Sequence, residues 1–225
     1  MNEVGAYGRP RVQTKFIFMT DNKMRTEILN IDKGQCLTDV LPAIPANTIF
    51  DKTITGCGAT HSEIVNAARH SIIIEPNIPV ILGKKAEHPF LFAVYEGITK
   101  EDVKAYLAGE HDGYRKIITT PEGFDKKVLP AMHELEIPVY KDYFLLFDEC
   151  EKAIQDVGYR GDIYLPVEDF FKFENKAMVS ATPIVPSDPR FEENGFKILK
   201  LVPTYDSRIE LTLCTTNNTV AVMRK

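Results

Sequence analysis

The chain has 225 residues and a formal charge of −5, with 44% apolar and 26% charged residues. These values are typical of a globular protein with one large domain, or one and a half small ones. The negative charge excludes recruitment of nucleic acid by overall electrostatics, so such binding would need a local basic patch. No apolar run approaches the ~18 residues of a membrane span, and Met1 opens a polar start rather than a signal peptide. We therefore expect a cytoplasmic protein with no membrane partner.

The four cysteines and five histidines give no metal pattern. The cysteines are scattered without a C-x-x-C pair, and no two histidines have the spacing of four that a helical metal site uses. A Cys57–His61 nucleophile pair has no identifiable third partner, so we do not favour it. The cysteine pattern indicates a reducing compartment.

The first half of the chain becomes regular only from about residue 48, and residues 1–44 are predicted to be an N-terminal extension. A strand at 48–54 leads into a glycine turn, and a short helix is expected over 60–69. Residues 71–75 and 90–97 are apolar runs typical of strands that are covered on both faces. Thr99 as N-cap and Gly109 just past the end predict a helix between them.

The second half continues the alternation of strand and helix. Strands are predicted at 116–121, 143–149 and 176–183, with a helix over 124–135 that is kinked near Pro130. The aromatic stretch 158–173 either docks a base or partner or, as we favour, folds back over the sheet. Residues 191–225 are β-rich and are expected to add edge strands or to begin an incomplete second domain.

This alternation predicts an α/β fold, a three-layer sandwich with a mainly parallel sheet. In open sheets of this kind, ligands bind at the edge formed by the carboxyl ends of the strands. Polar residues follow several of the predicted strands at that edge.

The glycine turn "TITGCGATHSEI", residues 53–64, has most parts of a phosphate-binding loop. Gly56 and Gly58 allow backbone N–H groups to converge on phosphate oxygens, and the Thr60 hydroxyl is placed to bind Mg²⁺. Ala59 stands where the phosphate-binding lysine is expected. A plain tight turn is therefore the alternative.

Two later segments carry a second and a third signal. "YFLLFDECE", residues 143–151, is an apolar strand that ends in Asp148 and Glu149, as a Mg²⁺-holding carboxylate and a water-activating carboxylate would. A strand that runs into an acidic helix start is the alternative. "MVSATPI", residues 178–184, is by itself only a strand end before a proline.

In this order and spacing, the three segments resemble the first RecA-like motor domain of superfamily 2 helicases, the DEAD/DEAH-type ATPases. "TGCGAT" (55–60), "DECE" (148–151) and "SATP" (180–183) match their motifs I, II and III. "IIIEPNIPV", "VYEG" and "TTPEGF" stand where the family contacts nucleic-acid backbone. The resemblance covers about residues 45–190, the predicted RecA-like P-loop NTPase domain.

The resemblance implies ATP and Mg²⁺ as cofactors, nucleic acid as a partner, single-stranded or duplex, and a second RecA-like lobe in cis or in trans. It implies Mg²⁺ binding by Thr60 and Asp148, and a catalytic role for Glu149, which orients or deprotonates the attacking water, beside Asp148. Coupling of nucleotide state to nucleic-acid grip would fall to Ser180 and Thr182. The nucleotide would be bound by Thr55, Gly56, Cys57, Gly58, Ala59, Thr60 and His61, and the nucleic-acid backbone by Pro76, Asn77, Gly97, Thr120 and Pro121.

Ala59 puts the ATPase activity in question, because loss of the lysine removes a charge that stabilises the transferring phosphoryl group. The domain is a degenerate ATPase that binds nucleotide weakly or not at all, or the alanine was engineered, or another cation substitutes. Candidates for that cation are Lys52, His61, Lys84 and Lys85. We favour degeneracy, which predicts negligible turnover and a gain of nucleotide affinity in Ala59→Lys. The competing interpretation is a non-enzymatic module that binds nucleic acid or a protein on this scaffold.

Overall fold

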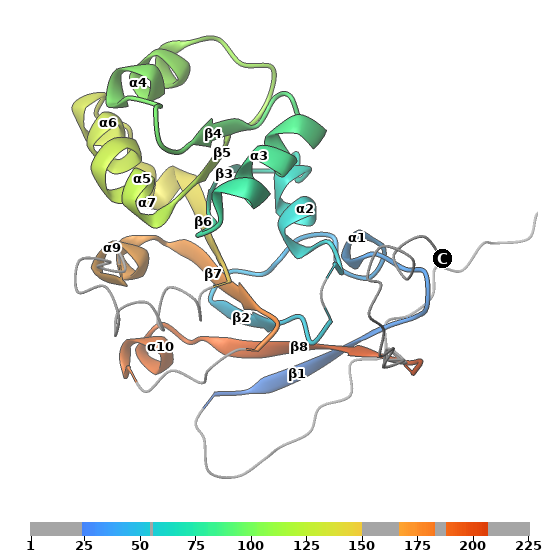
Figure 1. Ribbon diagram of the computed structural model, residues 1–225. Coiled ribbons are helices and arrows are strands. Elements are labelled where there is room, and N and C mark those ends of the chain that lie inside the picture. Colours follow the sequence, from blue (N-terminus) through green and yellow to red (C-terminus); the bar gives the residue numbers. More distant parts are fainter. Residues whose placement is uncertain (1–23, 55, 150–166, 183–187, 207–225) are drawn as a thin grey trace, which may run out of the picture.

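The computed structural model describes residues 24–54, 56–149, 167–182 and 188–206. They form one eight-stranded sheet in which every pair of neighbouring strands is parallel (Figure 1). The spatial order is β1-β8-β2-β7-β6-β3-β5-β4. This confirms the predicted α/β fold with a parallel sheet. The strands are β1 (Thr26–Ile31), β2 (Thr48–Asp51), β3 (His70–Ile74), β4 (Phe92–Val94), β5 (Lys116–Thr119), β6 (Tyr143–Asp148), β7 (Asn175–Ser180) and β8 (Lys197–Pro203).

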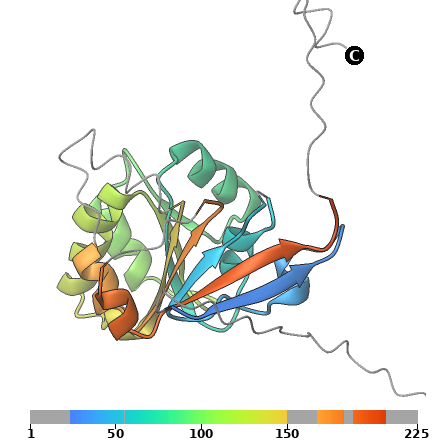
Figure 2. The ribbon, with the colours of Figure 1, turned by 90° about the horizontal axis from the view of Figure 1, so that it is seen from below.

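Helices cover both faces of this sheet and complete a three-layer sandwich (Figure 2). One apolar cluster packs the helices from α4 to α10 against one face, and a second packs α1, α2 and α3 against the other. The helical segments are α1 (Leu37–Val40), α2 (Ala59–Ile64), α3 (Ile78–Glu87), α4 (Lys100–Ala108), α5 (Pro121–Gly123), the π-helical η1 (Phe124–Val128), α6 (Leu129–Glu134), α7 (Val139–Asp142), α9 (Val167–Lys172) and α10 (Arg190–Glu193).

The central strands are apolar throughout because both of their faces are covered. All six residues of β6 are buried, and successive side chains alternate between the two clusters, with Phe144 in one and Leu145 in the other. This arrangement explains why the run reads as continuous rather than alternating. The polar residues at the end of β6 are thereby placed at the edge of the sheet.

Helix α4 begins and ends as predicted. The Asp102 amide donates to the Thr99 hydroxyl at 3.1 Å, and the Asp102 carboxylate accepts from the Thr99 amide at 2.8 Å, which makes a capping box. The helix predicted to be kinked near Pro130 consists of α5, the π-helical turn η1 and α6 in succession. Proline has no N–H to continue a regular helix, and the wider turn lies just before it.

Helix α2 is shorter than predicted. It ends at Ile64 instead of continuing to about residue 69. The side chain of Asn66 accepts a hydrogen bond from the Ala68 amide, a local turn that competes with helical hydrogen bonding.

Both ends of the described chain contribute strands to the same sheet. Strand β1 lies in the segment predicted as an N-terminal extension, and β8 lies in the predicted β-rich tail. The prediction that this tail adds an edge strand is wrong for β8, which lies inside the sheet between β1 and β2.

The described part of the aromatic stretch, residues 167–173, packs over the sheet, which is the favoured prediction. Phe170 and Phe173 are fully buried in the cluster that α4 and α6 share, and residues 158–166 lie outside the described ranges. Within the described ranges, no helix combines the length, about 20 residues, and the apolar character that a bilayer crossing requires.

If β8 belongs to the cooperative core, truncation of a buried β8 side chain will destabilise the whole domain. Leu201 is fully buried between β1 and the rest of the sheet, so Leu201→Ala is expected to lower the free energy of unfolding by about 2–5 kcal/mol. Urea denaturation followed by far-ultraviolet circular dichroism measures this. Leu82→Ala, at a side chain 45% exposed, is the matched control and should cost far less. A separate early transition, or equal effects of the two changes, would contradict the packing of β8 as an integral strand.

Candidate functional site

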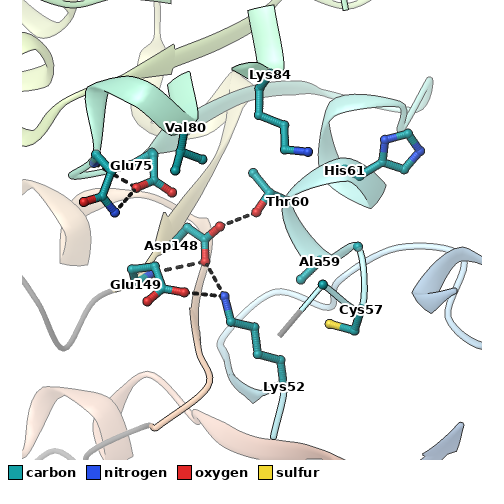
Figure 3. A pocket seen from close by; sticks show the side chains of 13 residues that line it. Lys52, Cys57, Ala59, Thr60, His61, Glu75, Val80, Lys84, Asp148 and Glu149 are labelled. Carbon is teal, nitrogen blue, oxygen red and sulfur yellow. Dashed lines mark hydrogen bonds and ion pairs between the residues drawn. The ribbon is translucent and has the colours of Figure 1, made fainter. Parts of the chain in front are cut away.

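The three segments singled out in the sequence meet at the carboxyl ends of β2, β7 and β6, which are consecutive in the sheet. The Thr60 hydroxyl donates a hydrogen bond to the Asp148 carboxylate, which joins the glycine turn to the end of β6 (Figure 3). The Lys52 amide donates to the Ser180 carbonyl at 2.9 Å, which joins the turn after β2 to the end of β7. The sequence predicted this juxtaposition, and the structure shows it.

Lys52 lies at the centre of this arrangement, immediately after β2. Its Nζ atom is 2.6 Å from Glu149 Oε1 and 3.3 Å from Asp148 Oδ1, and the residue is only 8% exposed. Burial by itself would lower the pKa of Lys52, but the charges and hydrogen bonds of Asp148 and Glu149 outweigh it and hold the pKa above its usual value. Lys52 is therefore a buried cation between two carboxylates.

The backbone on both sides of this ion pair is in a sparsely populated conformation. Thr53 has φ of 44° and Glu149 has φ of 50°, both in the left-handed region that non-glycine residues avoid. The Thr53 hydroxyl donates to the Leu201 carbonyl of β8, and the Glu149 amide donates to Asp148 Oδ1 at 3.0 Å. Such strain persists only where surrounding contacts hold it, and it clusters at functional sites.

The glycine turn adopts the conformation that its composition requires. Gly56 and Gly58 have φ of 76° and 86°, and a Cβ atom at either position would meet nothing within 4 Å. Glycine is needed here for its conformational freedom and not for space. Thr55, the other predicted nucleotide-binding residue of the turn, lies outside the described residues.

The side chains that follow the first glycine point in different directions. Cys57 is buried, and burial raises the pKa of its thiol, which disfavours a nucleophilic thiolate. Ala59 is only 4% exposed and packs in the apolar cluster on the α2 face. His61 is paired with His88, with 3.2 Å between Nδ1 and Nε2, and its ring is turned away from Asp148 in Figure 3.

These segments enclose a cavity of about 280 Å³. This volume is close to the lower end of the range for small-molecule pockets, about 300–1,000 Å³, so the cavity has room for a phosphate chain with its counter-ion. Its lining combines glycine backbone, a hydroxyl, carboxylates and ammonium groups: Lys52, Gly56, Cys57, Gly58, Ala59, Thr60, His61, Glu75, Asn77, Val80, Lys84, Asp148 and Glu149.

Glu75 is a member of the site that the sequence analysis did not single out. It follows β3 and is almost fully buried, and its Oε1 atom accepts from the Asn77 amide at 2.8 Å and from Asn77 Nδ2 at 2.9 Å. Burial, with the charges of Asp148 and Glu149, raises the pKa of Glu75 to about 7 against the two hydrogen bonds. The sequence did contain a signal for Glu75, because "IIIE" places a charged residue directly after an apolar strand.

The five predicted nucleic-acid contacts separate in space. Asn77 lines the cavity described above, whereas Thr120 lines a second hollow of about 260 Å³. Thr120 and Pro121 are buried, and the Thr120 hydroxyl already accepts from the Gly123 amide, so their side chains have little surface to offer. Gly97 is exposed with φ of 89°, and Pro76 is half-buried. The second hollow is lined by Ile78, Tyr95, Glu96, Thr120, Glu122, Gly123, Lys126 and Lys127.

The two predicted coupling residues differ in exposure. Ser180 is fully buried and its hydroxyl accepts from the Thr182 amide at 2.9 Å, whereas Thr182 is exposed. Ser180 also holds the backbone of Lys52 through its carbonyl. The end of β7 is thus connected to the ion pair by one hydrogen bond.

The donor set at the end of β6 suits a hard cation. Thr60 and Asp148 offer oxygen ligands, and Mg²⁺ is usually held by one or two carboxylates together with substrate phosphates. The described ranges contain no group of three or more histidine, cysteine or acidic side chains that could hold a metal by itself. The residues present fit a metal that arrives with a phosphate ligand.

No family model matches this chain, and no curated protein is similar to it.

The raised pKa of Glu75 predicts a specific pH dependence of stability. Between about pH 4.5, the ordinary value, and about pH 7, the unfolded chain loses the proton while the folded chain keeps it, so stability falls as pH rises. Glu75→Gln keeps an acceptor for Asn77 but cannot titrate, so it removes this loss of stability with rising pH. The variant should gain about 2–3 kcal/mol relative to the parent between pH 5 and pH 8.

Urea denaturation in the presence of a chelator at the two pH values measures this difference. Glu122→Gln, at an exposed carboxylate, is the control and should show the slope of the parent. Parallel pH profiles for the parent and Glu75→Gln would contradict the assignment.

Proposed function

We propose that this chain is the nucleotide-binding lobe of a helicase-like, nucleic-acid-dependent ATPase that acts in the cytoplasm. The observation that carries the proposal is the contact of Thr60 with Asp148 in a cavity that Gly56 and Gly58 also line. A glycine turn, a hydroxyl and a strand-end carboxylate are the parts that a phosphate and its Mg²⁺ require.

The residues of the site divide the work as follows. The Gly56–Gly58 turn would offer its amides to phosphate oxygens, and Thr60 with Asp148 would hold Mg²⁺, which would supply charge neutralisation for the phosphate groups. Glu149, held beside Asp148 by its own amide, orients the attacking water or accepts its proton. Ser180 transmits changes at the site to β7 through the Lys52 amide.

The proposal includes two partners. Nucleic acid would bind at the carboxyl edge of the sheet near the second hollow, where Lys126 is exposed and Tyr95 offers a ring. A second RecA-like lobe, in cis or in trans, would supply the arginine that completes catalysis. Turnover by the chain alone is therefore expected to be negligible.

The alternative function is a non-enzymatic module for nucleic acid or protein. One observation favours it: position 59, which lines the cavity, is an alanine, so the usual phosphate-binding cation is absent from its usual place. Such a module would keep the scaffold and the second hollow but would not bind nucleotide.

Thermal unfolding with and without nucleotide separates the two functions. At Mg-ATP or Mg-ADP concentrations tenfold above the dissociation constant, binding stabilises by about 1.4 kcal/mol, so the melting temperature should rise by about 3 °C or more. Asp148→Asn, which removes the charge from the proposed metal ligand, should abolish the rise. Asp142→Asn is the matched control because Asp142 directly precedes β6, at its opposite end.

A shift that depends on Asp148 and not on Asp142, with phosphate release near background, is the result expected. A shift that both variants retain would place the nucleotide elsewhere. No shift in the unsubstituted chain, together with salt-sensitive binding of a single-stranded oligonucleotide, would favour the non-enzymatic module.

A further inference from the structure

The proposed site lacks its usual cation, and the structure offers a small number of replacements. Position 59 lines the cavity but is an alanine, so it provides no charge there. Phosphoryl groups in a water-poor site require positive charge that is already in place. Lysine ammonium groups that line the cavity are those of Lys52 and Lys84.

Lys52 has the geometry that the role demands. Its ammonium is buried in the cavity wall, within 3.3 Å of two carboxylates, and it shares that cavity with Gly58 and Thr60. Its backbone is anchored on β7 through the Ser180 carbonyl, which leaves the flexible side chain as the part that moves. The ammonium therefore lies on the elements that a phosphate would contact.

The other candidate cations are less suited. Lys84 lines the cavity from α3, but its ammonium pairs with Glu87 at the exposed surface, at 2.9 Å, whereas Lys52 is held in the cavity wall beside the proposed metal ligands. Lys85 donates to the Pro89 carbonyl on the exposed side of the same helix and does not line the cavity. His61 is paired with His88.

We propose that Lys52 supplies the positive charge that Ala59 lacks, and that its ammonium exchanges Asp148 and Glu149 for phosphate oxygens when Mg-nucleotide binds. The inference rests on the proposed function and adds a residue and a regulatory step to it. Because one ammonium now neutralises the carboxylates that Mg²⁺ also needs, metal and lysine compete for the same oxygens. Arrival of metal with phosphate resolves the competition, since the phosphate gives the displaced ammonium a new anionic partner.

This exchange makes Lys52 a gate as well as a ligand. Mg²⁺ alone offers no anion to the displaced ammonium, so Lys52 opposes binding of the metal by itself. Mg-nucleotide offers both a cation for the carboxylates and an anion for Lys52. Removal of Lys52 should therefore weaken nucleotide binding and strengthen binding of the bare metal, whereas a merely structural role would weaken both.

The test titrates a fluorescent ATP analogue in Mg²⁺ buffer into the full chain and its variants. Lys52→Met keeps the apolar stem and removes the charge, and it should raise the dissociation constant about tenfold or more, as expected for loss of a charged hydrogen bond. Lys85→Met is the matched control and should stay within about twofold. Lys84→Met tests whether Lys84, the other lysine that lines the cavity, supplies the charge instead of Lys52.

Two further measurements separate charge from folding. In Lys52→Met/Ala59→Lys, a lysine at the usual position should recover most of the lost affinity. Thermal unfolding with Mg²⁺ alone should show a larger rise for Lys52→Met than for the parent chain. Lys52→Gln, which keeps a hydrogen-bond donor between the carboxylates, replaces the methionine variant if that variant does not fold.

The outcomes are distinct. Parental nucleotide affinity in Lys52→Met, or a loss only in Lys84→Met, would overturn the inference and leave the proposed function intact. Weaker binding of both nucleotide and bare metal in Lys52→Met would also overturn it, in favour of a structural role. No nucleotide binding by the unsubstituted chain would overturn the proposed function, and the inference with it.

Discussion

The ion pair that Lys52 makes with Asp148 and Glu149 is the interaction on which the site depends. It joins the turn after β2 to the end of β6 across the intervening strand β7, which itself holds the Lys52 backbone. An ammonium that is buried in this way needs its partners, and carboxylates at the end of a buried strand need a cation. The parallel order of the strands brings these charges to one edge, where the backbone at Thr53 and Glu149, next to the ion pair, is left-handed.

Much of this could be predicted from the sequence, because local patterns were consistent with one another. Apolar runs such as the one before Asp148 identified strands buried on both faces, and a parallel sheet necessarily collects their ends at one edge. The capping pattern at Thr99 located the start of α4, because the capping hydrogen bonds involve only residues three positions apart in the chain. The encounter of Thr60 with Asp148, across a separation of 88 residues, was predicted from the resemblance of their two motifs to helicase motifs I and II.

What could not be predicted depended on contacts between distant segments. Lys52 was one of four candidate cations, and only the position of β7 between β2 and β6 shows that it reaches both carboxylates. Glu75 acquires its raised pKa from burial and from Asp148 and Glu149, none of which a local pattern contains. The interior position of β8 likewise depends on pairing with β1, because an apolar run in the sequence does not indicate which strands it pairs with.

A crystal structure of the chain with Mg-ADP would test the central claim most directly. We predict a phosphate seated against Gly58 and Thr60, with Lys52 Nζ within about 3.2 Å of a phosphate oxygen and withdrawn from Glu149. A nucleotide bound away from the carboxyl ends of β2 and β6 would contradict the account. A phosphate in this cavity with Lys52 still held between the two carboxylates would contradict it as well.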